Sequence, residues 1–311
     1  MAPRALILLG LLLLPACSVK RYAVRQVGAS LNSGASVFES DRDVELVGGA
    51  LPFSLKLVES LLAEVPNDRN LLITACRGFT LYSYAYVDFE SDKLIEEDLE
   101  AGRAMRARAR RLYLRGLDYG LRGLEALYPG IRQELQRNPT EAVAVTNPKK
   151  ADRDLPLLYW SAASLGLAIS TATDDAAMLA RLPEVEALLN RALELNPDWD
   201  EGALYDFQLV YASSKPGPQD RELIERSFRK ALELSGGYNA SVYVSYAEAV
   251  AIPDQNVTLF REMMQKALAV DLDAAPDERL RNALAQRRAQ WLLDRIEDLF
   301  LVIDEPAPAN N

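Results

Sequence analysis

The stretch RALELNP at residues 191–197 ends a helical pattern and decides the fold. Val185, Leu189 and Ala192 recur at spacings of three and four residues, which predicts an amphipathic helix that stops at the proline. Similar endings return at KALELSG (230–236) and KALAVDL (266–272). A helix with a small residue at a fixed position near its end therefore repeats along the chain.

The spacing of these small residues predicts an array of helix pairs. Ala231 follows Ala192 by 39 residues, and Ala267 follows Ala231 by 36. Tetratricopeptide repeats have a period of about 34 residues, and longer loops between the helices account for the excess. No stretch shows the alternation expected of a strand. We predict an all-α, tetratricopeptide-like helix-pair array (an α-α superhelix), with repeats at about 155–197, 199–236 and 239–272 and a capping helix at 277–301.

The N-terminus predicts export and a lipid anchor. Arg4 precedes ten mostly aliphatic residues and then Leu-Pro-Ala-Cys ending at Cys17, a pattern that resembles a bacterial lipobox. The apolar run is too short to span a bilayer. We expect a signal peptide at 1–16, lipidation of Cys17 and, because Ser18 follows, sorting to the outer membrane facing the periplasm. Ordinary signal cleavage is the alternative. A lipidated tether would cover 17–40, the helical domain 41–303 and a disordered tail 304–311.

Composition excludes several classes of function. Without Arg4 the chain has 34 basic and 45 acidic residues, a net charge of about −11, which disfavours nucleic acid as a partner and leaves the lipid as the membrane attachment. Histidine is absent, which removes Ser-His-Asp catalysis and His-ligated zinc. We expect no enzyme activity, cofactor or metal. Once Cys17 is lipidated, Cys76 has no disulfide partner, and its apolar surroundings predict a buried, inert thiol.

Two further patterns concern helix packing. A helix predicted over 92–127 carries Gly116, Gly120 and Gly123 at the offsets that Ile224, Phe228 and Ala231 occupy in a later helix. Three glycines on one face predict that another helix backbone approaches closely. Beyond it, the two Asn-Pro pairs within residues 131–153 predict a loop or lid over one face.

Aromatic residues crowd the predicted inner helices and are the candidate ligand contacts. They either form core or line a groove where rings and hydroxyl groups meet a small molecule. Arg287 would add a cationic edge, unless the arginines of its helix pair with Glu248. The candidate ligand-binding residues are Phe79, Tyr82, Tyr86, Trp160, Tyr246, Arg287 and Trp291.

Several segments in order resemble the T component of tripartite ATP-independent periplasmic (TRAP) transporters. The resemblance extends from about Val37 to Leu301, and its motifs are residues 50–56, 78–87, 159–163, 243–248 and 286–293. It implies an extracytoplasmic lipoprotein with tetratricopeptide-like helix pairs, forming a homotrimer that associates with the soluble substrate-binding P component. It also implies no catalysis, and it favours small, hydrophobic organic ligands. A tetratricopeptide scaffold lipoprotein of the outer membrane, binding a peptide or an envelope-assembly protein, is the alternative.

Overall fold

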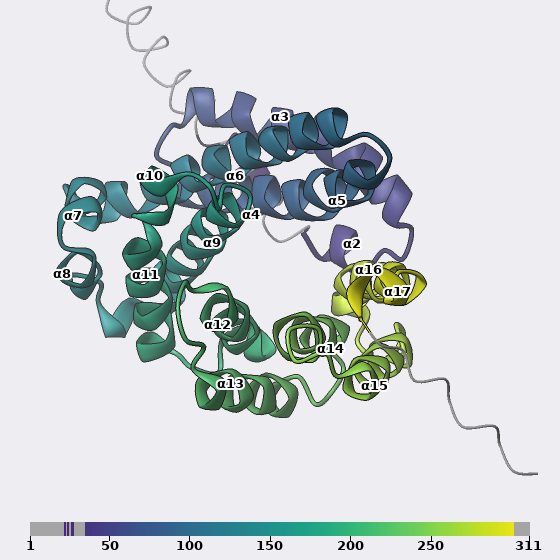
Figure 1. Ribbon diagram of the computed structural model, residues 1–311. Coiled ribbons are helices and arrows are strands. Elements are labelled where there is room, and N and C mark those ends of the chain that lie inside the picture. Colours follow the sequence, from purple (N-terminus) through teal and green to yellow (C-terminus); the bar gives the residue numbers. More distant parts are fainter. Residues whose placement is uncertain (1–21, 23, 25, 28–34, 302–311) are drawn as a thin grey trace, which may run out of the picture. The chain divides into compact units, whose positions relative to one another are not determined.

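The computed structural model describes residues 22, 24, 26–27 and 35–301. Every regular element in these residues is a helix, which confirms the all-α class (Figure 1). The predicted signal peptide, Cys17 and the predicted tail at 304–311 lie outside the described residues. The chain forms two compact units, unit 1 (Met1–Ala35 and Gly48–Leu188) and unit 2 (Ser36–Val47 and Leu189–Asn311).

Unit 1 contains most of α3 and the helices that follow it, up to the first half of α11. Their bounds are α3 (Val44–Glu64), α4 (Arg69–Ser83), η1 (Tyr84–Asp88), α5 (Phe89–Glu97), α6 (Leu99–Leu127), α7 (Ile131–Arg137), α8 (Pro139–Ala144), η2 (Pro148–Lys150), α9 (Ala151–Ser170), α10 (Ala176–Leu179) and α11 (Leu182–Leu195).

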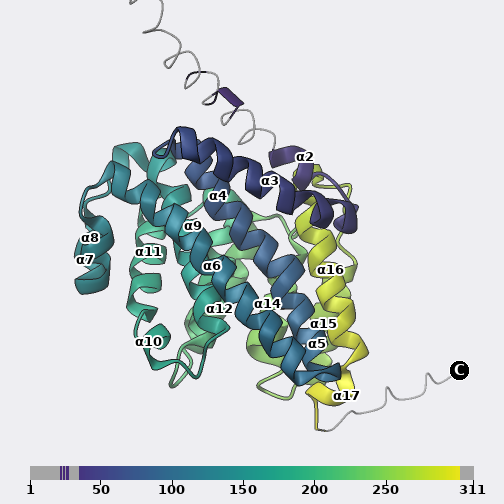
Figure 2. The same ribbon diagram turned by 90° about the horizontal axis from the view of Figure 1, so that it is seen from above.

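The core of unit 1 forms where α6 packs against α4, α5 and α9, which run beside it in Figure 2. Asp98 begins α6, because its carboxylate accepts hydrogen bonds from the backbone N–H groups of Glu100 and Ala101. The helix predicted over 92–127 is therefore two helices, α5 and α6, that meet at this cap.

Three glycines of α6 make the close approach that the sequence predicts. A Cβ atom added at Gly116 would lie 3.1 Å from the carbonyl oxygen of Cys76 on α4, and one at Gly123 would lie 2.5 Å from Leu157 on α9. At Gly120 the added atom would lie 2.8 Å from the Cys76 sulfur. Real Cβ atoms essentially never come as close to other heavy atoms as those at Gly120 and Gly123 would, and the distance at Gly116 is tighter than most real contacts, so only glycine fits this interface without a shift of its neighbours.

Unit 2 is built from successive helix pairs. Its elements are α2 (Ala35–Glu39, whose first residue belongs to unit 1), the second half of α11, η3 (Trp199–Gly202), α12 (Ala203–Ser214), α13 (Arg221–Leu234), α14 (Ala240–Tyr246), η4 (Ala247–Ala251), α15 (Val257–Leu268), η5 (Pro276–Glu278), α16 (Arg279–Asp294) and α17 (Ile296–Leu299).

Within unit 2, α12 packs on α13, α14 packs on α15, and α16 packs on both α14 and α15. Ala192, Ala231 and Ala267 are all fully buried, as expected of the small residues in the repeated pattern. The backbone of Ala231 lies close to Gly202, because a Cβ atom added at Gly202 would be 3.0 Å from the Cα atom of Ala231. The alanine positions are therefore true helix-packing positions.

Residues 131–153 are not the predicted loop. They form α7, α8 and η2 and the start of α9, and Ile131, Leu135 and Val143 are buried. The prediction was wrong because Pro139 was read as a helix breaker. It stands at the first position of α8, where its missing N–H group is not needed for an intrahelical hydrogen bond.

Candidate functional site

The aromatic residues predicted in α4 and η1 divide into a core ring and two half-buried rings. Phe79 is only 4% exposed and stacks on Tyr119 of α6, with ring centroids 5.8 Å apart. Tyr82 and Tyr86 stack on each other at 5.8 Å and are half-buried. The Arg108 guanidinium lies 3.5 Å from the Tyr82 hydroxyl. Phe79 therefore belongs to the core, and the two tyrosines form the more accessible pair.

This tyrosine pair lies where α4 changes into a π-helical turn, η1. The turn exposes Tyr84, which is 48% accessible, and sets Tyr86 against Gly48 of α3. A Cβ atom at Gly48 would lie 2.5 Å from the Tyr86 ring, so the glycine makes room for the tyrosine. Because π-helical turns are rare and are frequently found at functional sites, η1 is the part of unit 1 with the strongest claim to a binding role.

Arginine side chains cover several rings in unit 1. The Arg115 guanidinium lies 4.9 Å from the centre of the Phe79 ring, and the Arg77 guanidinium lies 5.5 Å from the centre of the Trp160 ring. Trp160 is 8% exposed and also packs edge-on against Tyr159. These cation–π contacts fix the rings and place positive charge at the border of the aromatic core.

Glu59 organises the same region, and sequence analysis did not predict its role. Its carboxylate accepts a hydrogen bond of 2.6 Å from the Tyr119 hydroxyl and pairs with Arg115 and Lys56. Burial opposes its ionisation, but the hydrogen bonds from Lys56, Tyr119 and Arg115 outweigh that effect and lower the Glu59 pKa. Because Glu59 and Tyr119 are 60 residues apart, no local pattern could have revealed the contact.

Cys76 has the inert character that the sequence predicts. It is fully buried and free of disulfides, and its sulfur lies 3.7 Å from the Ser164 hydroxyl. Burial raises the pKa of its thiol to about 12. A neutral thiol in an apolar interior is neither a nucleophile nor a metal ligand.

In unit 2 the predicted Tyr246 stacks on Phe228 of α13, with ring centroids 3.9 Å apart. It ends α14 just before the second π-helical turn, η4. Burial raises the pKa of the Tyr246 hydroxyl, and nearby charges of both signs adjust it. Tyr246 packs against the hydrophobic clusters on both sides of α14, so it serves mainly as a packing residue.

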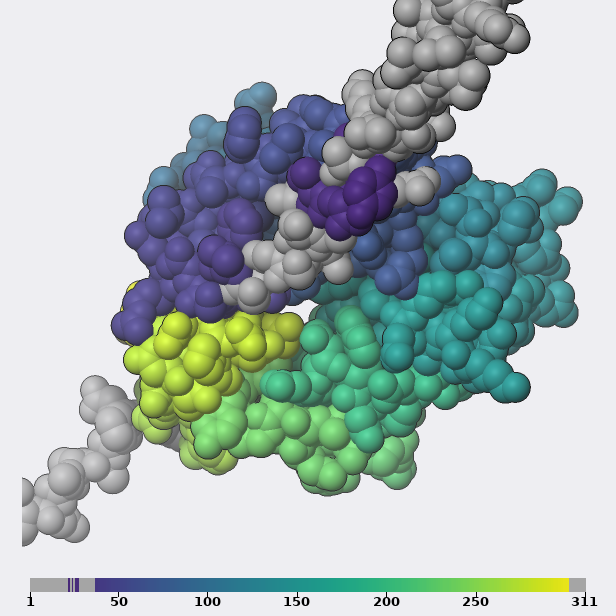
Figure 3. Space-filling view, turned by 180° about the vertical axis from the view of Figure 1, so that it is seen from behind, coloured from purple at the N-terminus to yellow at the C-terminus, as the bar shows by residue number. Residues whose placement is uncertain are grey.

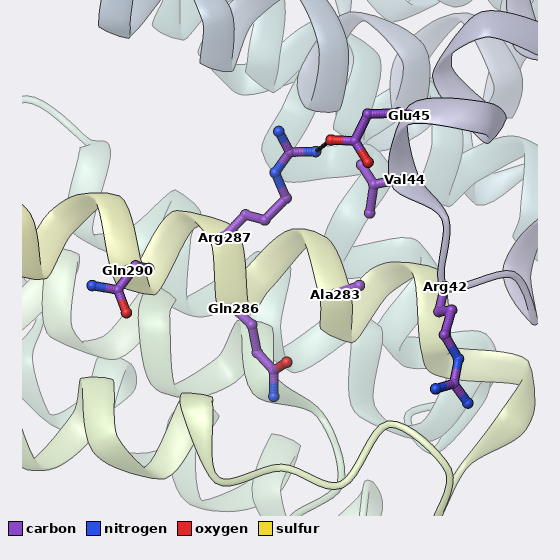
Figure 4. A pocket seen from close by; sticks show the side chains of 7 residues that line it. All are labelled: Arg42, Val44, Glu45, Ala283, Gln286, Arg287 and Gln290. Carbon is purple, nitrogen blue, oxygen red and sulfur yellow. Dashed lines mark hydrogen bonds and ion pairs between the residues drawn. The ribbon is translucent and has the colours of Figure 1, made fainter.

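Arg287 and Trp291 lie on α16. The Arg287 guanidinium forms an ion pair of 2.7 Å with Glu45 at the start of α3, and the two side chains point toward each other in Figure 4. The alternative partner, Glu248, is bound by Arg288 at 2.7 Å. The Trp291 ring lies between Arg288 and Arg295, whose guanidinium carbons are each 4.6 Å from the ring centre.

An open pocket of about 350 Å³ surrounds the Arg287–Glu45 pair (Figure 4). Its lining is Arg42, Val44, Glu45, Ala283, Gln286, Arg287 and Gln290. Several polar groups at its wall already have partners, because Gln286 donates to the Val270 carbonyl at 2.8 Å and Arg42 pairs with Asp273. A carboxylate ligand would have to replace Glu45 on Arg287, and this exchange costs little because exposed ion pairs contribute at most about 1 kcal/mol.

Asp206 on α12 was also missed. Its carboxylate accepts a hydrogen bond of 2.9 Å from the Ser241 hydroxyl of α14. Burial raises the Asp206 pKa, against the opposing effects of hydrogen bonds from Ser245 and Ser241 and of the Arg281 charge. In the sequence Asp206 lies between two aromatic residues, Tyr205 and Phe207, and this local pattern does not indicate that its carboxylate bonds to another helix. Among the residues that the structure describes, no group of three or more potential ligands is arranged to bind a metal.

In unit 1, Tyr82 packs against the cluster of Phe79 and stacks on Tyr86, whereas Trp160 lies in a separate cluster that Tyr119 joins to the first. Unit 2 holds Tyr246 within its core and Arg287 and Trp291 on α16. Their role in ligand binding stays a prediction.

Comparisons with known proteins identify the chain. A family model described as the TRAP transporter T-component matches residues 40–300. A protein of Treponema pallidum (strain Nichols), described as an uncharacterized protein, is 29% identical over 267 residues, covering 85% of this chain and 83% of that protein. The T-component family is a transporter accessory family and is not a known enzyme family. The matched region includes almost all the helices described above, and the chain belongs to the T-component family of TRAP transporters.

Proposed function

We propose that this protein docks the soluble substrate-binding P component of a TRAP transporter at the periplasmic face of the cell envelope. Membership of the T-component family supports an accessory role in such a transporter. The chain has no histidine and a net charge of −10, a composition better suited to recognition than to acid–base catalysis. The P component is the partner that the family resemblance names.

The η1 region is the observation that best supports a ligand contact. Tyr82 and Tyr86 present half-buried rings, Tyr84 is exposed, and Arg108 lies beside the Tyr82 hydroxyl. Such a surface offers ring faces to apolar parts of a small organic molecule and hydroxyl and guanidinium groups to its polar parts. We therefore place the contact with the ligand of the P component here, and Arg287, in the pocket of unit 2, is a separate candidate contact.

Co-purification tests the docking. The protein, immobilised as bait, should capture a TRAP-type substrate-binding protein from a periplasmic extract. Tyr82→Ala and Tyr86→Ala should lower ligand-dependent capture, whereas Tyr238→Ala, at a tyrosine that is 52% exposed in unit 2, should leave it unchanged. Recovery of envelope-assembly proteins without a substrate-binding protein would instead support the scaffold function.

The lipid anchor is part of the proposal and has its own test. We expect globomycin-sensitive processing and palmitate incorporation at Cys17, with sorting to the outer membrane because Ser18 is not an inner-membrane retention signal. Cys17→Ser should abolish the labelling. Equal labelling of this variant would contradict lipidation at Cys17.

The proposed assembly is a homotrimer. Sedimentation equilibrium of the detergent-solubilised lipoprotein should give three times the mass of one chain, after correction for bound detergent. A mass of one chain at micromolar concentration would refute a stable trimer.

A further inference from the structure

The exposed side of α3 is mainly apolar between Leu46 and Ala63, and its exposed acidic residues, Glu45 and Glu64, lie at the two ends of the helix. Phe53 is 74% exposed, the largest value among the exposed aromatic residues that the structure describes, and Leu57 is 37% exposed. Gly49, Pro52 and Ala63 are also exposed along this part of the helix. We call the outward surface formed by Gly49, Pro52, Phe53, Leu57 and Ala63 the α3 face. The surface of α3, coloured purple to blue, lies open in the view of Figure 3.

Charge is distributed unevenly around α3. Lys56 lies beside the α3 face with 68% of its side chain exposed, whereas Glu59 is turned inward and is only 10% exposed. In a chain with 45 acidic and 35 basic residues, the middle of this strip has no exposed carboxylate, and the exposed Glu45 and Glu64 lie only at its ends. An apolar strip next to a lysine suits the boundary between lipid headgroups and acyl chains, where lysine places its stem in the apolar layer and its amine near the phosphates.

The length and composition of α3 are those of a membrane helix, but its packing excludes a transmembrane position. By length and composition it is the one described helix long and apolar enough to cross a bilayer. Only 22% of its most apolar 18-residue window is buried, so most of this window faces outward. Leu55, Val58 and Leu62 on its other side are buried in the core with α4. A helix held by the protein on one side and apolar on the other fits the position of an interfacial helix, which lies on the bilayer.

The chain length from the predicted anchor brings this helix to the bilayer. Val24 packs against the core cluster that contains Leu55 and Val58 of α3. Val24 follows Cys17 by seven positions, so the two residues are at most about 25 Å apart along the chain. A helix with its side chains is only about 10–12 Å across, so the α3 face lies within reach of the layer that holds the acyl chains of Cys17.

We propose that the α3 face binds the surface of the phospholipid bilayer and gives the protein a second attachment beside its lipid anchor. This inference rests on the anchoring in the proposed function. Two or more acyl chains on Cys17 would already anchor the protein stably, so the contribution expected of the α3 face is mainly to hold the protein against the surface. It also fixes the orientation of unit 1. The anchor alone would let the protein rotate about one point, whereas the anchor and the helix together hold it against the membrane surface.

Site-directed fluorescence tests the orientation in the full lipoprotein. Cys76 is buried with a thiol pKa of about 12, so a cysteine introduced at the surface can be labelled selectively. An environment-sensitive dye at Phe53→Cys would be compared with the dye at Val145→Cys, a control in unit 1 that is 55% exposed. In vesicles of phosphatidylethanolamine and phosphatidylglycerol, nitroxide-labelled lipids should quench the dye at position 53 at least about threefold more than at position 145. Equal quenching of anchored protein would overturn the proposal.

A second measurement separates the α3 face from the anchor. The Cys17→Ser chain should still partition weakly onto the same vesicles, and Phe53→Glu with Leu57→Glu should reduce that partition by about tenfold or more, since two apolar side chains would be replaced by charges. Both positions are exposed, so circular dichroism should show an unchanged fold. Unchanged partition together with lost capture of the P component would assign the α3 face to a protein partner and refute the membrane contact. Palmitate labelling reports on Cys17 independently.

Discussion

Helix α6 of unit 1 and helix α13 of unit 2 have the same three packing positions but fill them in opposite ways. In α6 they are Gly116, Gly120 and Gly123, and all three are buried. In α13 they are Ile224, Phe228 and Ala231, so two large side chains take the place of two glycines. One helix packs through its backbone and the other through its side chains.

The neighbouring helices differ in the same sense. Facing the α6 glycines are the small polar groups of Thr80, Ser161 and Ser164, with the Thr80 and Ser164 hydroxyls 2.5 Å apart. Facing α13 is the Tyr246 ring, stacked on Phe228 at 3.9 Å. A helical glycine costs up to about 1 kcal/mol relative to alanine, so the α6 glycines are tolerated only because the close contact offsets that cost. The lesson is that a repeated pattern fixes which positions pack without fixing the distance between the helices.

The largest effect should come from filling the glycine interface. Gly120→Leu adds a side chain whose first carbon alone would lie 2.8 Å from the Cys76 sulfur. Overpacking of this kind typically costs 1–3 kcal/mol, and here we expect about 3 kcal/mol or more, because backbone and short side chains line the space. Urea unfolding followed by circular dichroism measures the loss.

Gly49 provides the matched control for Gly120. It lies in α3 with no atom within 4 Å of an added Cβ atom. Gly49→Ala should therefore stabilise the protein by about 0.5–1 kcal/mol, the ordinary helix preference for alanine, while Gly120→Ala destabilises it. Stabilisation by both substitutions would show that the α6 interface accommodates an added methyl group.

Removing the ring that fills the equivalent space in unit 2 should have the next largest effect. Phe228→Ala leaves a cavity beside Tyr246, and since Phe228 is only partly buried we expect a loss of about 2–3 kcal/mol, below the range for a fully buried ring. Tyr238→Ala, at an exposed ring in the same unit, should change the free energy of unfolding by less than about 0.5 kcal/mol. A comparable loss in both variants would contradict the packing role of Phe228.

A smaller loss is expected at the position that both helices keep small. Ala231 is fully buried, and its backbone lies against Gly202. Ala231→Leu should cost about 1–2 kcal/mol through overpacking, while Ala231→Gly should cost about 1 kcal/mol through helix propensity. Thermal unfolding of both variants compares the two terms. Stabilisation by leucine would mean that a void lies beside Ala231.

The fold was predictable because its signals are local and repeated. The spacing of Ala192, Ala231 and Ala267 predicted buried packing positions, and Gly116 with Gly120 predicted a close helix contact; the structure confirms both. These predictions succeed because a helix brings residues three or four apart onto one face.

The missed features depend on residues far apart in sequence or on backbone geometry without a sequence signal. The Glu59–Tyr119 contact joins α3 to α6, and Asp206 meets Ser241 across two helices. Neither π-helical turn was predicted, because no residue preference marks one. The loop predicted around Pro139 was wrong because proline can begin a helix as well as end one. The ligand-binding role of the aromatic residues stays a prediction, because aromatic residues have the same spacing along a helix whether their rings fill a core or line a groove.

The smallest expected effects are opposite in the two units and depend on pH. The Glu59 pKa in unit 1 is lowered, so its ionised form stabilises the fold fully above its ordinary pKa of 4.5, and this contribution is lost as the pH falls through the lowered pKa. The Asp206 pKa in unit 2 is raised from 3.8, so its ionised form destabilises the fold near neutral pH, and this penalty is relieved as the pH falls through the raised pKa.

At pH 7, Glu59→Gln should lower the free energy of unfolding and Asp206→Asn should raise it, each by about 1 kcal/mol. Both differences from the wild type should shrink on acidification toward pH 4, when urea unfolding is repeated across that range. If Asp206→Asn proves destabilising at pH 7, the hydrogen bonds from Ser241 and Ser245 outweigh the cost of burying the charge, and the two units do not differ in sign.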